Sequence, residues 1–416
     1  MDEPSPAGAV PEGDALHMAR AIRLAALGRG TTSPNPVVGC VVVDASGAHA
    51  GEGFHAYAGG PHAEVVALSE AGERARGGTA YVTLEPCDHT GRTGPCSQAL
   101  LEAGVARVVI AVLDPNPKAA GGMGRLRAHG VRVDSGLMAE EAERGNAEWL
   151  TFVRLGRPHV TWKFAATLDG RSAAQDGTSQ WITSPEARAD VHRLRAESDA
   201  IVAGIGTVLA DDPRLTARPE DGPAHRFDGR PSAWLDARPG TELGDRPGDW
   251  PDDRLGDRLG DRQGPRQGVR RRPPLRVVVD SEARTPPGAR VLSAEAPTLI
   301  AIADDAKTEL QAPVLRLPRA HPKGLDLHAL LAELARREIV SVFVEGGPAL
   351  AGSFMREGLV DRVVAYLAPA LLGSGAAALG PAGVRTIADT HRLVFEDVTP
   401  IGTDLRITAR PASEEH

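Results

Sequence analysis

The chain has 416 residues, and its 47 Lys and Arg against 55 Asp and Glu give a formal net charge of −8. An acidic chain with only 4% aromatic residues lacks the positive field and the stacking surfaces of a nucleic-acid binder. No apolar run reaches the roughly 20 residues of a membrane helix, the N-terminal stretch shows no signal pattern, and three cysteines are too few for a disulfide framework. We therefore expect a cytoplasmic protein of two or three domains, with neither nucleic acid nor a membrane as its partner.

Helix and strand patterns alternate through the first part of the chain. Asp14 is the expected N-cap of a first helix that runs to Leu27. Further helices are expected over 62–72, 97–103 and 139–157, and strands over 37–43, 79–84 and 107–113. This alternation predicts an α/β layered domain over residues 14–155.

A second α/β domain is expected over residues 158–411, after the connection Leu155-Gly156-Arg157-Pro158. Its predicted strands are 159–166, 200–204, 276–280, 298–303, 361–368 and 405–409, its predicted helices are 185–196 and 328–338, and 339–358 is expected to form a strand, a turn and a helix.

Residues 219–274 interrupt this second domain. They are rich in Gly, Pro and charges of both signs, and Gly-Asp-Arg recurs at 244, 256 and 260. Such a segment cannot bury enough apolar surface to offset the entropy of ordering it. We predict a disordered insertion, with a charged interaction arm as the alternative.

The clearest chemical pattern of the first domain is His62-Ala63-Glu64, followed by Cys87 and Cys96, each directly after a proline. An imidazole and two thiolates are good zinc ligands, and three protein ligands leave a fourth position for water, whose pKa the metal lowers towards ~7. Glu64, near a helix start, can face that position and carry a proton from water to a leaving amine. This is the pattern of a zinc deaminase, except that eight residues rather than two separate the cysteines.

A structural zinc site is the alternative, but such a site usually has four protein ligands. Cys40 is the only other cysteine, and it lies in a buried-strand run where a core residue is the favoured interpretation. A structural site also gives no reason for Glu64, so the pattern favours a catalytic site.

The motifs around this site resemble one family. Asn35-Pro36-Val37-Val38-Gly39, His62-Ala63-Glu64, the run from Glu85 to Cys96 and Asp114-Pro115-Asn116-Pro117 are similar to the deaminase half of the bifunctional riboflavin-biosynthesis deaminase–reductases. The resemblance implies a cytidine-deaminase-like three-layer fold and hydrolytic removal of the 2-amino group of 2,5-diamino-6-(5-phosphoribosylamino)pyrimidin-4-one.

The resemblance also implies roles for individual residues. His62, Cys87 and Cys96 would be the zinc ligands, with Glu64 as the proton shuttle. Substrate contacts would be made by Asn35, His55 and His89. Asp88 and Gly94 stand where many relatives have Ser and Pro. Neither is a ligand, so this departure concerns the shape of the loop rather than the chemistry.

The second domain lacks the Gly-x-Gly-x-x-Gly fingerprint of a dinucleotide-binding Rossmann domain. Glu345-Gly346-Gly347 lies between a predicted strand and Pro348, a plausible first helical residue, so a helix N-terminus could bind a phosphate there. An ordinary glycine-rich turn explains this segment equally well. Arg195, Arg214 and Arg218 flank the segment 204–213, and the pattern alone leaves open whether they bind a phosphate or lie on the surface.

The resemblance covers this half too. The run from Lys163 to Arg171, Ser179-Gln180-Trp181-Ile182-Thr183, the run from Thr207 to Pro213 and Glu345-Gly346-Gly347-Pro348 are similar to the family's reductase half. That half implies a dihydrofolate-reductase-like fold and NADPH-dependent reduction of the ribosyl group by hydride delivery to C1′, after deamination.

By position, the resemblance assigns two sets of contacts in the reductase half. NADPH contacts map to Ala165, Trp181, Thr207, Asp211, Ser281, Gly347, Pro348, Ala349, Leu350, Ala351, Gly352 and Ser353. Substrate contacts map to Ser179, Arg195, Leu215, Arg218 and Glu345. Arg195 and Arg218 would hold the 5′-phosphate. Lys163, one of four lysines in the chain, would contact or polarise the substrate, whereas a strand lysine that extends to solvent is the alternative.

Three other functions are the alternatives. A nucleic-acid-editing deaminase does not fit the acidic charge and the few aromatic residues. A monofunctional deaminase with a degenerate second half is disfavoured by the motifs at Ser179, Asp211 and Glu345, and a non-enzymatic zinc-stabilised scaffold remains to be separated by zinc titration. The expected protein is a bifunctional enzyme with zinc and NADPH as cofactors, a small-molecule substrate and a homodimer or higher oligomer as its assembly.

Overall fold

The computed structural model describes residues 12–89, 94–217, 272–320 and 324–412. The chain divides into two compact units, Met1–Arg157 and Pro158–His416. Of the insertion predicted over 219–274, all but the last three residues lie outside the described residues. None of the described helices is both long and apolar enough to cross a membrane.

The first unit is built on a mixed sheet. Among the described residues, five strands pair in the order β2-β1-β3-β4-β5, with β1 antiparallel to β2 and β3 and the other pairs parallel. These strands are β1 (Gly39–Val43), β2 (His49–Phe54), β3 (Thr79–Leu84), β4 (Arg107–Val112) and β5 (Arg132–Ser135). Their buried faces consist mainly of Val, Ile and Ala, the residues that pack well on a pleated surface.

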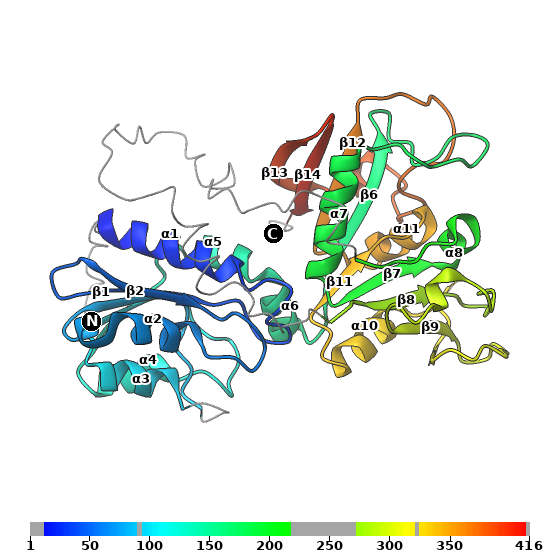
Figure 1. The fold of residues 1–416 in the computed structure, drawn as a ribbon. Coiled ribbons are helices and arrows are strands. Elements are labelled where there is room, and N and C mark those ends of the chain that lie inside the picture. Colours follow the sequence, from blue (N-terminus) through cyan, green and yellow to red (C-terminus); the bar gives the residue numbers. More distant parts are fainter. Residues whose placement is uncertain (1–11, 90–93, 218–271, 321–323, 413–416) are drawn as a thin grey trace. The chain divides into compact units, whose positions relative to one another are not determined.

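Helices cover both faces of this sheet (Figure 1). The helices α1 (Glu12–Ala26) and α5 (Ala139–Gly145) lie on one face. The other face carries α2 (Ala63–Ala71), which runs on into the 3₁₀ turn η1 (Gly72–Ala75), with α3 (Cys96–Ala103) and α4 (Gly122–Ala128) beside it. The helix α6 (Ala147–Leu155) ends the unit. The expected three-layer α/β arrangement is therefore confirmed.

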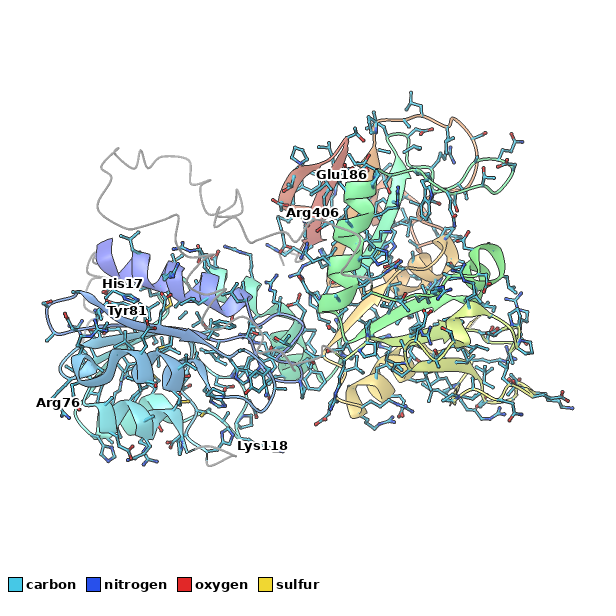
Figure 2. The ribbon with its side chains drawn as sticks, viewed as in Figure 1. His17, Arg76, Tyr81, Lys118, Glu186 and Arg406 are labelled. Atoms are coloured by element: carbon cyan, nitrogen blue, oxygen red, sulfur yellow. The ribbon has the colours of Figure 1, made fainter. Side chains whose placement is uncertain are left out.

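Two expectations about helices of this unit were wrong. Asp14 does not cap α1: it lies inside the helix, and its carboxylate accepts hydrogen bonds from Tyr81 at 2.6 Å and from Arg107 at 2.8 and 3.0 Å. Figure 2 labels Tyr81 and His17, whose rings lie 5.0 Å apart beneath α1. The helix expected over 139–157 is two helices, because Asn146 leaves the helical conformation and its side chain accepts the Val37 N–H at 3.1 Å.

The second unit contains a larger sheet. Its described strands pair in the order β10-β9-β8-β7-β11-β6-β12-β14-β13, and all pairs are parallel except those of β14 with β12 and β13. The strands are β6 (His159–Thr167), β7 (Ala200–Gly204), β8 (Leu275–Val279), β9 (Thr298–Ala303), β10 (Val314–Leu317), β11 (Ser341–Val344), β12 (Arg362–Ala368), β13 (Leu393–Ile401) and β14 (Asp404–Pro411).

Two hydrophobic clusters show which helices cover which face. One cluster joins α8 (Ile205–Asp211), α10 (Leu327–Arg336) and α11 (Pro348–Arg356) to one face of the sheet. The other places α7 (Pro185–Glu197) on the opposite face, against Phe343, Val364 and Tyr366. Short 3₁₀ turns, η4 (Arg290–Leu292) and η5 (Ile387–Asp389), lie in the connections.

Candidate active sites

Three candidate ligands meet in the first unit. His62 directly precedes α2, Cys87 follows β3, and Cys96 is the first residue of α3. The ligand atoms of these residues all lie within 4.8 Å of one another. His62 Nδ1 is 3.2 Å from Cys96 Sγ and 3.6 Å from Cys87 Sγ. The cluster is thus formed where β3 ends and where the neighbouring helices α2 and α3 begin.

Hydrogen bonds between the three side chains shift their pKa values. Hydrogen bonding with Cys96 and His62 holds the pKa of the Cys87 thiol well below its ordinary value, despite the opposing effect of burial. The hydrogen bond with Cys87 raises the pKa of His62. One imidazole nitrogen and two sulfurs, close together and poorly hydrated, form a donor set that fits zinc.

Glu64 is buried beside this cluster. It is the second residue of α2, with only 3% of its surface exposed. Burial raises the pKa of its carboxyl group, which also interacts with the Cys96 side chain. A carboxyl group with a raised pKa can both accept and return a proton near neutral pH.

The remaining candidates of this half differ in their placement. His55 is buried, its ring lies 5.4 Å from that of His62, and its Nδ1 bonds the Pro61 carbonyl at 3.0 Å while Nε2 has no partner. His89 and Asn35 are exposed, on the loop after Cys87 and on the turn before β1. Cys40 is fully buried in the hydrophobic cluster of β1, which confirms the expectation of a core residue.

In the second unit, the candidates gather at one edge of the sheet. The strands β8, β7, β11 and β6 are adjacent and parallel, so their carboxyl ends lie together. Ser281 follows β8, Thr207 and Asp211 lie on α8 after β7, and Glu345 follows β11. The carboxyl edge of a parallel sheet is where ligands of α/β proteins usually bind.

A half-buried ion cluster lies at this edge. Arg195, near the end of α7, donates from Nε and Nη2 to the two carboxylate oxygens of Glu345, at 2.6 and 2.5 Å. Its Nη1 reaches the Thr216 carbonyl at 3.3 Å. Burial alone would raise the pKa of Glu345, but the charges of Arg195 and Lys163 lower it.

Lys163 lies on β6, as expected, and faces this cluster. Burial lowers the pKa of its ammonium group, and the charge of Glu345 partly offsets this effect. Its Nζ also lies 5.9 Å from the ring centre of Tyr366 on β12. A half-buried lysine beside a carboxylate and an aromatic face is held in place at the site rather than extended into solvent.

The candidate NADPH contacts divide into exposed and packed residues. Gly347 is the N-cap of α11, Pro348 is its first residue as predicted, and the Gly347 N–H donates to Thr207 Oγ1 at 3.1 Å. Ala349 and Ser353 lie on the accessible side of this helix, whereas Leu350, Ala351 and Gly352 are buried. In this first turn Pro348 has no N–H, and the Leu350 N–H donates to the Gly347 carbonyl at 3.1 Å. A phosphate here would therefore meet the positive end of the helix dipole rather than a row of free N–H groups.

The other predicted contacts surround this edge. Trp181 is 69% exposed, and Ser179 Oγ donates to the Asp211 carboxylate at 3.5 Å. Ala165 is half-buried, and Leu215 is buried. Arg218 lies outside the described residues.

Two partners of these residues were not predicted from the sequence. Tyr366 lies under Lys163, and its hydroxyl donates to Asp190 at 2.6 Å, which also accepts from Arg406, labelled in Figure 2. The Arg188 guanidinium lies 4.5 Å from the Trp181 ring centre. Strand pairing places Tyr366 beside Ala165. That register is not evident in the sequence of either strand.

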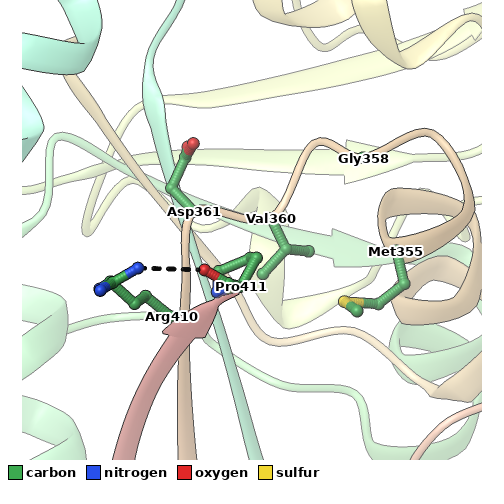
Figure 3. A pocket seen from close by; sticks show the side chains of 6 residues that line it. All are labelled: Met355, Gly358, Val360, Asp361, Arg410 and Pro411. Atoms are coloured by element: carbon green, nitrogen blue, oxygen red, sulfur yellow. Dashed lines mark hydrogen bonds between the residues drawn. The ribbon is translucent and has the colours of Figure 1, made fainter. Parts of the chain in front are cut away.

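A cavity of about 350 Å³ lies elsewhere in the second unit. Figure 3 shows its lining residues, which come from the end of α11, the connection to β12 and the end of β14. Asp361 and Val360 precede β12, so the cavity lies at the amino end of this strand. It is therefore separate from the site at the carboxyl ends of the strands.

Comparisons with known proteins agree with both sites. Residues 11–112 match the family model of the cytidine and deoxycytidylate deaminase zinc-binding region, and residues 158–407 match the RibD C-terminal domain. The riboflavin biosynthesis protein RibD of Escherichia coli is 44% identical over 395 residues, which cover 94% of this chain and 98% of that protein. The Mycobacterium tuberculosis protein of the same name is 43% identical and covers 91% of this chain and 92% of its own.

Solved structures show the same likeness over the whole chain. Acinetobacter baumannii RibD superimposes with a TM-score of 0.76 at 35% identity and covers 97% of this chain and 99% of its own. A Thermotoga maritima diaminohydroxyphosphoribosylaminopyrimidine deaminase/5-amino-6-(5-phosphoribosylamino)uracil reductase has a TM-score of 0.76 at 31% identity, with 96% and 99% covered. This chain belongs to the RibD family.

As a RibD protein, the chain is a bifunctional enzyme of riboflavin biosynthesis, with a zinc-binding deaminase domain and a reductase domain. The cytidine-deaminase-like and dihydrofolate-reductase-like folds expected from the motifs are confirmed. Its cofactors are zinc and NADPH, and the cluster of His62, Cys87 and Cys96 is the group of described residues that could hold the metal.

Proposed function

We propose that residues 14–155 deaminate 2,5-diamino-6-(5-phosphoribosylamino)pyrimidin-4-one and that residues 158–411 then reduce the ribosyl group of the product. The T. maritima relative bears the names of these two activities. The observation that carries the proposal is the cluster of His62, Cys87 and Cys96 with the buried Glu64 beside it.

In the deaminase half, His62, Cys87 and Cys96 hold the zinc. When bound, zinc lowers the pKa of a water ligand to about 7. Glu64 takes the proton from the attacking water and passes it to the departing 2-amino group, so that a C–O bond forms, the C–N bond breaks and ammonia leaves. His55, Asn35 and His89 contact the substrate. The unpartnered Nε2 of His55 supports this role for the buried histidine.

In the reductase half, Lys163 and Glu345 contact the substrate together with Ser179, Arg195, Leu215 and Arg218. NADPH, when bound, would supply a hydride for C1′: the C1′–O4′ bond breaks, a C1′–H bond forms, and the ring oxygen takes a proton from water to become the ribityl hydroxyl. Because Arg195 already donates two hydrogen bonds to Glu345, it also orients that carboxylate.

The NADPH contacts of this half lie on three elements after the strands. Thr207 and Asp211 on α8, Ser281 after β8, and Gly347 to Ser353 on α11 bind the cofactor, with Ala165 and Trp181 beside them. The N-terminus of α11, where Gly347 is the N-cap, supports a phosphate contact there through the helix dipole.

The edge of the larger sheet supports a homodimer. The strand β13 lies at this edge, and Leu393, Val394, Phe395 and Val398 on it are exposed, as is Leu405 on β14. An apolar edge strand invites pairing with another chain. A homodimer formed through this edge would cover it.

The three cysteines, which form no disulfide, fit a reducing cytoplasm.

Replacement of Glu64 by Gln tests the deaminase assignment. The variant should bind one zinc ion per chain, because Glu64 is not a ligand, and should lose about 10²–10⁴-fold of its ammonia release. Glu70→Gln, an exposed position of the same helix, is the matched control and should keep its activity. Full ammonia release by zinc-loaded Glu64→Gln would refute the assigned proton carrier.

Replacement of Lys163 by Met tests the reductase assignment. The variant should oxidise NADPH at least tenfold more slowly with the deaminated substrate, while ammonia release from the first substrate stays unchanged. Unaltered kcat and KM for the reduction would show that Lys163 does not contact the substrate.

A further inference from the structure

The residues at the two ends of the loop between the cysteine ligands, within 87–89 and 94–97, are joined by hydrogen bonds. Eight residues separate Cys87 from Cys96, and an open loop of this length loses entropy when its ends are brought together. The Ser97 N–H donates to the Cys87 carbonyl at 3.2 Å, and the Cys96 N–H lies 3.5 Å from Cys87 Sγ. The ends of the loop therefore hold the two sulfurs near each other through the protein's own hydrogen bonds.

Asp88, the residue after the first cysteine, makes the central contact. Its Oδ1 accepts a hydrogen bond from Ser97 Oγ, the residue after the second cysteine, at 2.6 Å. The same oxygen accepts from Arg125 Nη1 on α4 at 3.2 Å. Its own N–H donates to the Ala119 carbonyl at 3.0 Å. One carboxylate oxygen thus joins the two ends of the loop and ties both to α4.

The partners of Asp88 are themselves fixed. Ser97 is fully buried, and Arg125 Nη2 donates to Gln98 on α3 at 2.5 Å. The start of α4 is held by the buried carboxylate of Glu85, which accepts from the N–H groups of Gly121 and Met123 at 3.1 and 3.0 Å. A pre-organised frame of this kind lowers the cost of arranging ligands around a metal.

We propose that Asp88 is a positioning residue of the zinc site, which holds Cys87 and Cys96 at ligand distance through Ser97 and Arg125. It is not part of the described group that could hold the metal, which consists of His62, Cys87 and Cys96. Its effect on zinc binding comes through the loop. A serine at this position could accept the bond from Ser97 but could not form the ion pair with Arg125.

The test is the zinc affinity of the full-length protein, measured by competition with a chromophoric chelator. Asp88→Ala should bind zinc about 10–100-fold more weakly than the parent protein. The zinc affinity of Asp88→Ser should lie between those of Asp88→Ala and the parent protein, because serine keeps one of the two contacts. The loss of zinc-binding free energy in the Asp88→Ala/Arg125→Ala double variant should be smaller than the sum of the losses in the two single variants, because the residues act through one contact.

Glu70→Gln is the matched control, since Glu70 is exposed on α2 and accepts from the Glu52 N–H rather than from a residue of this frame. It should leave zinc affinity unchanged. The unfolding free energy of the zinc-free variants separates a structural role from a positioning role. If Asp88→Ala binds zinc within twofold of the parent protein, the proposal is overturned, whatever its stability. If Asp88→Ala does not fold, Asp88→Ser and Arg125→Ala are judged by the same twofold limit.

Discussion

At the scale of single residues, a few poorly hydrated charges define both sites. Glu64 and the cluster beside it form the proposed deaminase site, and Lys163, Arg195 and Glu345 belong to the proposed reductase site. Each of these groups has little access to solvent. Its electrostatic interactions are therefore stronger than those of a group on the surface. These groups are therefore suited to hold or move a proton, or to orient a substrate.

Other buried charges stabilise the fold. Glu52 on β2 accepts two hydrogen bonds from Arg20 on α1, at 2.7 and 2.9 Å, and only 15% of its side chain is exposed. Burial acts to raise its pKa, but hydrogen bonds with His49 and Arg20 lower it to about 2. Since its pKa in the unfolded chain is higher, this pair stabilises the fold at neutral pH, and the stabilisation is lost as the pH falls through about 5 towards 2.

Glu52→Gln should therefore lower the free energy of unfolding by about 1–3 kcal/mol at pH 7 and make acid denaturation less steep between pH 5 and 2. Urea titrations of the zinc-loaded protein at several pH values provide the measurement. An equal loss of stability in both proteins across this pH range would contradict the account of Glu52.

At the scale of elements, the strongly periodic segments were predictable and the irregular ones were not. The strands 79–84, 200–204 and 298–303 were predicted with the observed bounds, because buried runs of apolar residues mark them. The strand β2 was missed because its residues, His-Ala-Gly-Glu-Gly-Phe, show no apolar alternation. Its glycines are explained by packing, since a Cβ at Gly51 would lie 2.4 Å from the Ala67 carbonyl of α2.

Other elements were missed for related reasons. The helix α8 follows β7 directly, and β10 is a strand of only four residues, Val314–Leu317. The edge strand β13 is largely exposed and so lacks a buried pattern. The motifs that identify the family predicted the zinc cluster, whereas the partners of Lys163 and Trp181 depend on strand register and loop contacts that no local pattern shows.

Gly51→Ala should destabilise the first unit by about 1–3 kcal/mol, because its methyl group would force α2 away from the sheet. Gly13→Ala, within α1 and with no atom near its Cβ position, should leave stability unchanged or raise it by up to about 1 kcal/mol. Chemical denaturation of both variants gives the comparison. A Gly51→Ala protein as stable as Gly13→Ala would contradict the close packing of β2 and α2.

At the scale of the whole molecule, the proposed dimer depends on the edge strand β13. Phe395 is 68% exposed there, so Phe395→Glu should convert the dimer to a monomer in light scattering after size-exclusion chromatography. Leu16→Glu, an exposed apolar position of α1 in the other unit, is the control and should keep the parent mass. A Phe395→Glu protein that stays dimeric would place the interface elsewhere.

The bifunctional account also predicts that the two activities can be separated by the metal. Removal of zinc with a chelator should abolish ammonia release, because the proposed deamination needs the metal. The effect should be confined to the deaminase half, because His62, Cys87 and Cys96 all belong to the first unit. NADPH oxidation with the deaminated substrate should continue, and added zinc should restore ammonia release. Loss of both activities together would contradict separate sites.

The most direct measurement is a coupled assay of the zinc-loaded protein with the diaminopyrimidine ribotide, run with and without NADPH. The account predicts ammonia release in both runs and NADPH oxidation that begins only after deamination. Ammonia release without any NADPH oxidation would contradict the assignment of the reductase half, and the absence of ammonia would contradict the central claim that the His62, Cys87 and Cys96 cluster is a deaminase site.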